Sequence, residues 1–202
     1  MKKLFGLMGA FLLSTSAFAG VSGGVNLASD YFFRGVSQTQ GESAVQWNLE
    51  AEKKGVYGGT WGSQVDFGGE ASIEYDFYGG YRWENDKVGV DSGVIQYNYN
   101  NEVDSVEEWY GILSVGMVSL GYWRDRDNKD LDYKQVEVAL PFIKAADVSV
   151  RYGEAGDSQY GQVSISKELK KGFSVALEVI DDVDEAISYD ESQVAFHVGY
   201  TF

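Results

Sequence analysis

The chain has 202 residues, an aromatic content of 15% and a formal net charge of −15 at pH 7. A surface this acidic repels nucleic acid, and a chain this rich in aromatic residues is not expected to be disordered. The sequence contains no cysteine, which excludes disulfides, cysteine-based zinc sites and a cysteine nucleophile. We therefore expect one domain that is stabilised by burial and backbone pairing.

The first 19 residues have the layout of a secretory signal peptide. Lys2 and Lys3 precede an apolar stretch, and small residues follow as far as Ala19. The apolar stretch is too short, and too interrupted by serines, for a membrane helix, which needs about 20 apolar residues. The sequence thus predicts a signal peptide over 1–19 and an exported domain over 20–202.

Apolar and polar residues alternate through most of the remaining chain, and no helical period is sustained. In the segment 44–52, for example, Trp47 and Leu49 alternate with Asn48 and Glu50. This period of two indicates strands that each have one apolar face. About twelve strands are expected, near residues 21–31, 44–52, 56–66, 71–81, 88–99, 106–115, 117–123, 131–140, 147–153, 160–168, 172–180 and 193–202.

The segment 88–99 does not keep one parity. Val90 falls on one face, whereas Ile95 and Tyr97 fall on the other. A β-bulge near Ser92 would place all the apolar residues on the same face, and we expect one there.

Two architectures suit such one-sided strands: a soluble sandwich or barrel with its apolar face inward, or a transmembrane barrel with that face in lipid. Strands of about ten residues suit a tilted bilayer crossing. The polar faces carry amides, hydroxyls, glycines and acids but few lysines, which is typical of a wet lumen. The apolar faces carry rings suited to a membrane interface, namely Trp47, Trp61, Tyr81, Trp109, Tyr122, Tyr152 and Tyr200.

The membrane alternative is favoured, and in lipid an open sheet edge would leave backbone groups unpaired. We therefore expect an all-β, antiparallel transmembrane β-barrel of about twelve strands, with ten or fourteen also compatible. Short connections such as 53–55 would face the periplasm. Longer acidic ones such as 124–132 and 181–192 would face outward.

The last predicted strand alternates strictly and ends on an aromatic residue. Its outward side chains include Phe196, Val198, Tyr200 and Phe202, and we expect this strand to pair with the first and close the barrel. The assembly machinery of Gram-negative outer membranes is associated with last strands of this kind. The expected location is that membrane, with its lipid and the assembly machinery as partners.

The segment 29–39 reads SDYFFRGVSQT. It resembles the motif of the TorF porin family, long known only as conserved bacterial proteins of unknown function. The resemblance extends through GGYRW, SGVIQYNY and the terminal strand, and it implies an outer-membrane channel without supplying a solute. The motif residues are Ser29, Asp30, Tyr31, Phe33, Arg34, Gly35, Ser37, Gln38 and Thr39, with Phe32 at the variable position.

Arg34 is expected at the outer end of the first strand. A guanidinium there can pair bidentately with a lumen carboxylate and hold the first loop as a constriction. The simpler alternative is an ordinary salt bridge at a strand end.

The polar strand faces place many charges in the lumen. The principal candidates are Arg34, Glu50, Glu74, Asp76, Glu137, Arg151, Glu178 and His197, and the alternation adds Asp66, Arg82 and Glu108. Such an acid-rich lumen favours cations or neutral polar solutes over anions. Alternatively, the same groups form a network that plugs the barrel.

The function expected from these features is passive diffusion of small polar solutes or ions, with a preference for cations. The main alternative is a plugged structural or adhesive barrel. A barrel hydrolase is less favoured, because His197 is the only histidine and no nucleophile elbow is present. No enzyme activity, cofactor, metal site or nucleic-acid partner is predicted.

Overall fold

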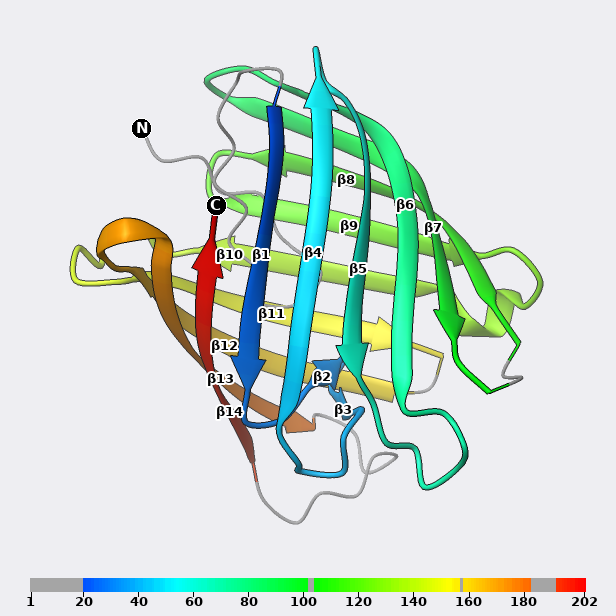
Figure 1. The fold of residues 1–202 in the computed structure, drawn as a ribbon. Coiled ribbons are helices and arrows are strands. Elements are labelled where there is room, and N and C mark those ends of the chain that lie inside the picture. Colours follow the sequence, from blue (N-terminus) through cyan, green and yellow to red (C-terminus); the bar gives the residue numbers. More distant parts are fainter. Residues whose placement is uncertain (1–19, 102–103, 157, 183–191) are drawn as a thin grey trace.

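The structure is a computed structural model that describes residues 20–101, 104–156, 158–182 and 192–202. The predicted signal peptide lies outside these residues. Twelve strands form one closed antiparallel barrel, which confirms the predicted fold class (Figure 1). The strands are β1 (Gly20–Ala28), β4 (Ala44–Lys53), β5 (Val56–Gln64), β6 (Ile73–Glu84), β7 (Val88–Tyr99), β8 (Val106–Val115), β9 (Val118–Asp125), β10 (Tyr133–Ala139), β11 (Asp147–Ala155), β12 (Ser158–Glu168), β13 (Phe173–Asp182) and β14 (Gln193–Thr201).

Four short elements accompany the barrel. β2 (Phe32–Phe33) and β3 (Val36–Ser37) pair as a separate hairpin between β1 and β4. The turns η1 (Lys129–Leu131) and η2 (Lys170–Gly172) connect barrel strands. Within the described residues no helix is long and apolar enough to cross a membrane.

Each barrel strand pairs with its neighbours along the chain, and β14 pairs with both β13 and β1. At the closing seam, Asn26 lies opposite Gly199 and Leu27 lies opposite Val198. Closure therefore leaves no strand edge of the barrel unpaired.

The wall of the barrel is apolar on its outer face and polar on its inner face, which is the reverse of a soluble barrel. On the outside, Val21, Trp109 and Phe196 are 69%, 60% and 61% exposed. On the inside, Glu74 and Asp76 are only 2% exposed. An apolar exterior around a polar interior is the arrangement expected of a barrel surrounded by lipid.

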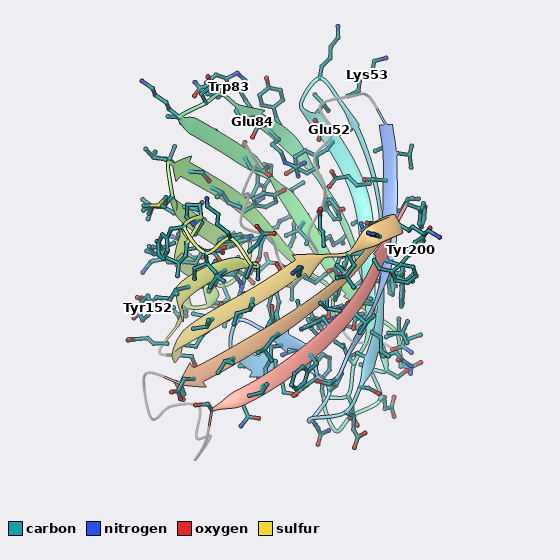
Figure 2. The ribbon with its side chains drawn as sticks, turned by 90° about the vertical axis from the view of Figure 1, so that its left-hand side faces the viewer. Glu52, Lys53, Trp83, Glu84, Tyr152 and Tyr200 are labelled. Atoms are coloured by element: carbon teal, nitrogen blue, oxygen red, sulfur yellow. The ribbon has the colours of Figure 1, made fainter. Side chains whose placement is uncertain are left out.

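The connections differ between the two ends of the barrel. At the end that holds Lys53, Trp83 and Glu84 (Figure 2), residues 54–55 and 116–117 are sufficient to join neighbouring strands. At the opposite end, residues 29–43 and 65–72 form longer links. Of the predicted lumen acids, Asp66 lies in one of these longer links, where it is exposed and accepts a hydrogen bond from Gln40, so its inward placement was wrong.

The expected bulge near Ser92 is absent, because β7 keeps a continuous register with both β6 and β8. Ile95 and Tyr97 face inward and are 1% and 3% exposed. The inner face of β7 carries Asp91 together with these apolar residues, and its Tyr97 lies beside the β2–β3 hairpin. The ring of Phe33 in this hairpin lies 5.6 Å from that of Tyr97.

Trp61 also departs from the predicted outer aromatic face. It pairs with Asn48 and Asp76, whose side chains are buried inside, and its ring lies 5.3 Å from that of Tyr31. The prediction was wrong because an aromatic residue can serve an interior hairpin as well as a lipid interface. Most of the other predicted rings are exposed on the outside, including those of Tyr152 and Tyr200 (Figure 2).

Candidate functional site: the barrel interior and its first loop

The link between β1 and β4 folds over the interior of the barrel. Its β2–β3 hairpin lies beside the strand ends within the barrel outline (Figure 1). Tyr31, just before β2, contacts the β5 side of the wall through Trp61. Phe32 belongs to a cluster with Ile180 of β13 and Ala195 of β14. The hairpin therefore reaches opposite parts of the wall.

The motif residues hold this hairpin together. The carboxylate of Asp30 accepts hydrogen bonds from the hydroxyls of Ser37 and Thr39, each at 2.7 Å. The backbone N–H of Tyr31 donates to Thr39 Oγ1 at 3.2 Å, and the N–H of Gln38 donates to the carbonyl of Tyr31 at 2.7 Å. The short polar side chains thus replace the backbone pairing that so short a hairpin lacks.

Two further contacts join the hairpin to the barrel. Ser29 exchanges hydrogen bonds of 2.9 Å with the backbone of Phe196, which extends the seam between β1 and β14. The N–H of Asp66 donates to the carbonyl of Gln38 at 2.7 Å. Both ends of the first loop are therefore fixed.

Arg34 lies at the turn of the hairpin rather than at the end of the first strand, because β1 ends at Ala28. It has a φ of +51° and precedes Gly35, which has a φ of +86°. A Cβ atom on Gly35 would lie 2.7 Å from Cγ of Tyr160 on β12. Glycine is required here by both the left-handed backbone and the close approach to the wall.

The guanidinium of Arg34 forms a bidentate ion pair with Glu108 of β8. Nη1 donates to Oε1 at 2.7 Å and Nη2 donates to Oε2 at 2.6 Å. The same carboxylate accepts a hydrogen bond of 2.9 Å from the hydroxyl of Tyr97. The guanidinium carbon lies 4.3 Å from the ring centroid of Tyr133 and 4.7 Å from that of Phe33, which adds cation–π attraction.

Arg34 does not lose its proton at ordinary pH. Burial alone lowers the pKa of Arg34, but Tyr97 and the carboxylate of Glu108 outweigh it and raise the pKa above its usual value. Burial, followed by the nearby carboxylates of Glu74 and Asp76, raises the pKa of Tyr31 well above its usual value. Arg34 therefore stays charged and Tyr31 stays neutral.

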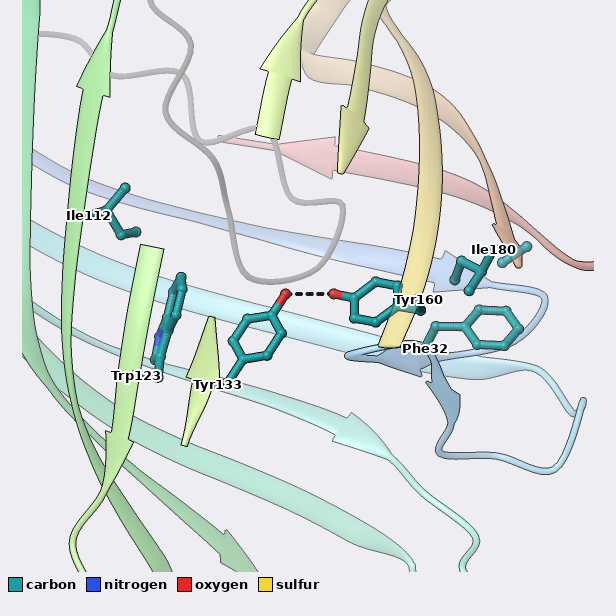
Figure 3. Packing of buried hydrophobic residues seen from close by; sticks show 7 residues of the cluster. Phe32, Ile112, Trp123, Tyr133, Tyr160 and Ile180 are labelled. Carbon is teal, nitrogen blue, oxygen red and sulfur yellow. Dashed lines mark hydrogen bonds between the residues drawn. The ribbon is translucent and has the colours of Figure 1, made fainter. Parts of the chain in front are cut away.

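Buried aromatic residues surround the hairpin on the β9, β10 and β12 side. The hydroxyls of Tyr133 and Tyr160 are hydrogen-bonded at 2.6 Å, and Phe32 lies close to Ile180 (Figure 3). The rings of Tyr133 and Trp123 are 5.2 Å apart. We did not predict these residues as part of the site. Trp123 and Tyr133 fall on the polar faces of their strands, and this position in the sequence could have indicated that they face the interior.

Most of the predicted interior charges form ion pairs with one another. Arg82 lies 3.1 Å from Asp91, 3.2 Å from Glu52 and 3.4 Å from Glu50. On the opposite wall, Arg151 donates to Glu137 at 2.7 Å.

His197 lies on the inner face of β14, and its side chain is 6% exposed. Its Nδ1 lies 3.1 Å from Nδ2 of Asn26, and its Nε2 lies 3.4 Å from Oε2 of Glu178. None of its described contacts is with a serine hydroxyl.

Glu74 and Asp76 differ from the other interior acids. The hydroxyl of Tyr99 donates to Glu74 Oε1 at 3.4 Å, but Glu74 Oε2 and Asp76 Oδ1 have no hydrogen-bond partner among the described residues. Neither acid forms an ion pair with an arginine or lysine of the described residues. Across the described ranges, no group of three or more histidines or acids is arranged to hold a metal ion.

Acids outnumber bases on the inner wall. The buried acidic side chains are those of Glu50, Glu74, Asp76, Asp91, Glu108, Asp125, Glu137 and Glu178, and the arginines among them are Arg34, Arg82 and Arg151. A closed barrel with this polar interior, an apolar exterior and an inward-folded loop defines the class of porin-like β-barrels.

The chain belongs to the Gcw_chp family, described as a bacterial protein of unknown function, whose model matches residues 14–201. No curated protein matches the chain. Among solved structures it is similar to the KdgM porin, with a TM-score of 0.64 and 10% identity over 90% of this chain and 98% of that one. A KdgM porin in complex with disordered oligogalacturonate gives a TM-score of 0.62 and 9% identity, over 90% and 97%.

A third similar structure comes from a study of the in-meso crystallization of membrane proteins. Its TM-score is 0.57 and its identity 11%, over 90% of this chain and 83% of that one. At these identities the likeness establishes the fold, a closed porin-like barrel, and not the solute.

Proposed function

We propose that this protein is an outer-membrane channel for passive diffusion of small polar solutes or ions, as the resemblance to the TorF porins implies. The observation that carries the proposal is the polarity of the wall: exposed apolar side chains outside and charged side chains inside a closed barrel. The apolar exterior suits lipid, and the predicted export segment and closing strand suit outer-membrane assembly.

The interior charge supports a preference for cations. Each of the three interior arginines is bonded to a carboxylate, whereas Glu74 and Asp76 have no basic partner among the described residues. The interior groups that lack a partner of opposite charge are therefore acids, and rings of acids favour cations in other pores. A polyanion such as the oligogalacturonate of the KdgM complex would be disfavoured in this lumen.

The first-loop hairpin is the proposed constriction. It is fixed at its tip by Arg34 and Glu108 and at its base by Asp30. A loop held across the interior by charged and aromatic contacts narrows the path for solutes and limits their size.

The same hairpin favours the second candidate, a plugged barrel with a structural or adhesive role. Phe32 and Tyr31 contact opposite parts of the wall, so the hairpin can block the path as well as narrow it. A hydrolase has less support, because His197 contacts Asn26 and Glu178 rather than a nucleophile.

Planar-bilayer recording of the purified, folded barrel separates these candidates. A channel gives stepwise conductance, and in a KCl gradient its reversal potential has the sign of cation preference. A bilayer that stays silent, although the heat-dependent gel shift of a folded barrel is present, supports the plug and refutes the channel.

A further inference from the structure

Glu74 and Asp76 form an acidic pair on the inner face of β6, and within the described ranges the pair has no basic partner. Two residues apart on one strand, they project to the same side of the sheet. The arginines of the interior are bonded elsewhere: Arg34 to Glu108, and the other two to carboxylates of their own.

The pair is buried and leaves polar atoms without partners in the part of the chain that the structure describes. Each side chain is 2% exposed, and Glu74 Oε2 and Asp76 Oδ1 accept no hydrogen bond. Asn48 is in the same inward row, because it pairs with Trp61, which in turn pairs with Asp76. Asn48 is 6% exposed, and neither its Oδ1 nor its Nδ2 has a partner. Buried polar groups are almost always satisfied, so unsatisfied groups gathered on one part of the wall favour binding of a polar ligand there.

Aromatic rings flank the acids. Trp61 and Tyr97 pair with Asp76 on its two sides, and Tyr99 pairs with Glu74. From the hairpin, Tyr31 packs on Trp61 at 5.3 Å. Aromatic rings together with carboxylates are the environment that recognises ammonium groups, through ion pairing together with cation–π attraction.

A metal ion suits this site less well. Calcium takes about six to eight oxygen ligands, and no group of three acids or histidines converges on a point within the described ranges. Rings contribute nothing to such a shell, whereas they contribute directly to an organic cation.

We infer that Glu74, Asp76 and the rings of Tyr31, Trp61, Tyr97 and Tyr99 form a binding site for a small organic ammonium ion. The inference deepens the proposed function, since it names the solute class for which the channel has an internal site. Binding requires the folded barrel, and transport additionally requires an open path.

Methylammonium is a suitable probe, and isothermal titration of the folded barrel in detergent measures its binding without any current. The test variant is Glu74→Gln with Asp76→Asn, which keeps the shape of both side chains. The matched control is Glu42→Gln with Glu70→Gln, which removes two exposed loop carboxylates. Tyr31→Leu is a second variant that removes one ring and leaves both acids.

We expect saturable binding to the natural chain and to the control, and binding weaker by at least about tenfold in the acid variant. Tyr31→Leu should weaken binding by a smaller factor, on the order of threefold. The site is refuted by absent binding to the natural chain, by equal binding to the acid variant, or by calcium displacing methylammonium at lower concentration than other amines do. A barrel that binds methylammonium but passes no current refutes the channel and leaves the site intact.

Discussion

Asn26 of β1 and His197 of β14 contact one another across the seam where the barrel closes, with Nδ2 and Nδ1 3.1 Å apart. Asn26 also donates to Oε1 of Gln46 on β4 at 2.8 Å. An amide nitrogen can only donate, so Nδ1 of His197 accepts from Asn26. On the other side of the ring, Nε2 lies 3.4 Å from Oε2 of Glu178. This polar chain spans four neighbouring strands and links the two ends of the sequence.

Asn26→Leu should destabilise the barrel, because it leaves buried acceptors on both His197 and Gln46 without a donor. The expected loss is about 1–3 kcal/mol of the free energy of unfolding. Urea unfolding in lipid vesicles, followed by tryptophan fluorescence, measures it. Glu42→Gln in an exposed loop is the control and should change little. Equal stability of the two variants would show that the seam is determined by backbone pairing alone.

Arg34→Met should release the tip of the first loop and increase single-channel conductance. The variant loses the bidentate bond to Glu108 and the cation–π contacts with Tyr133 and Phe33. Glu108→Gln should also increase conductance. In unfolding experiments, the double variant should lose less free energy of unfolding than the sum of the two single losses, with a coupling of about 0.5–3 kcal/mol. Unchanged conductance in both single variants would mean that the hairpin does not restrict the path.

Gly35→Ala should displace the hairpin without removing any charge. The new Cβ would lie 2.7 Å from the ring of Tyr160, on a backbone with a φ of +86°. Gly41→Ala is a matched control, because Gly41 has a φ of +83° and a Cβ added there would meet no described atom within 4 Å. Both variants share the left-handed strain of about 1–2 kcal/mol, and only the first adds the clash. We expect Gly35→Ala alone to reproduce the conductance of Arg34→Met; identical conductance in the two alanine variants would exclude the clash as the cause.

Glu74→Lys with Asp76→Lys should shift ion preference toward anions. The substitutions replace by bases the two interior acids that no described arginine pairs with, and charge at a pore wall sets selectivity. Reversal potentials in a KCl gradient measure the shift, with Glu42→Lys and Glu70→Lys as the exposed pair for comparison. A reversal potential that moves only in the loop variant would locate selectivity at the mouth of the barrel instead.

The barrel could be predicted from the sequence because its evidence is local and repeated. Each strand has one apolar face, and β14 carries Phe196 and Val198 on the side that the structure leaves exposed. The position of the first loop could not be predicted in the same way. Its contacts join Arg34 to Glu108, 74 residues away, and no periodic pattern encodes such a pairing.

The two errors in strand faces have the same origin. Trp61 and Tyr97 were assigned by assuming that apolar side chains face lipid, whereas their rings lie beside those of Tyr31 and Phe33. The motif that builds the hairpin was recognisable, but its destination inside the barrel depends on the closed shape. The predicted faces are therefore reliable where strands face only lipid and water, and they fail where the loop folds in.

The continuous register of β7 can be tested directly, because the natural chain has no cysteine to interfere with labelling. Val90 pairs with Leu113 and Val94 pairs with Trp109, so both valines should face lipid. Spin labels on Val90→Cys and Val94→Cys should both be more accessible to oxygen, which partitions into lipid, than to a water-soluble nickel chelate. A bulge at Ser92 would instead place the two labels on opposite faces, and the label at residue 94 would then respond to the nickel chelate.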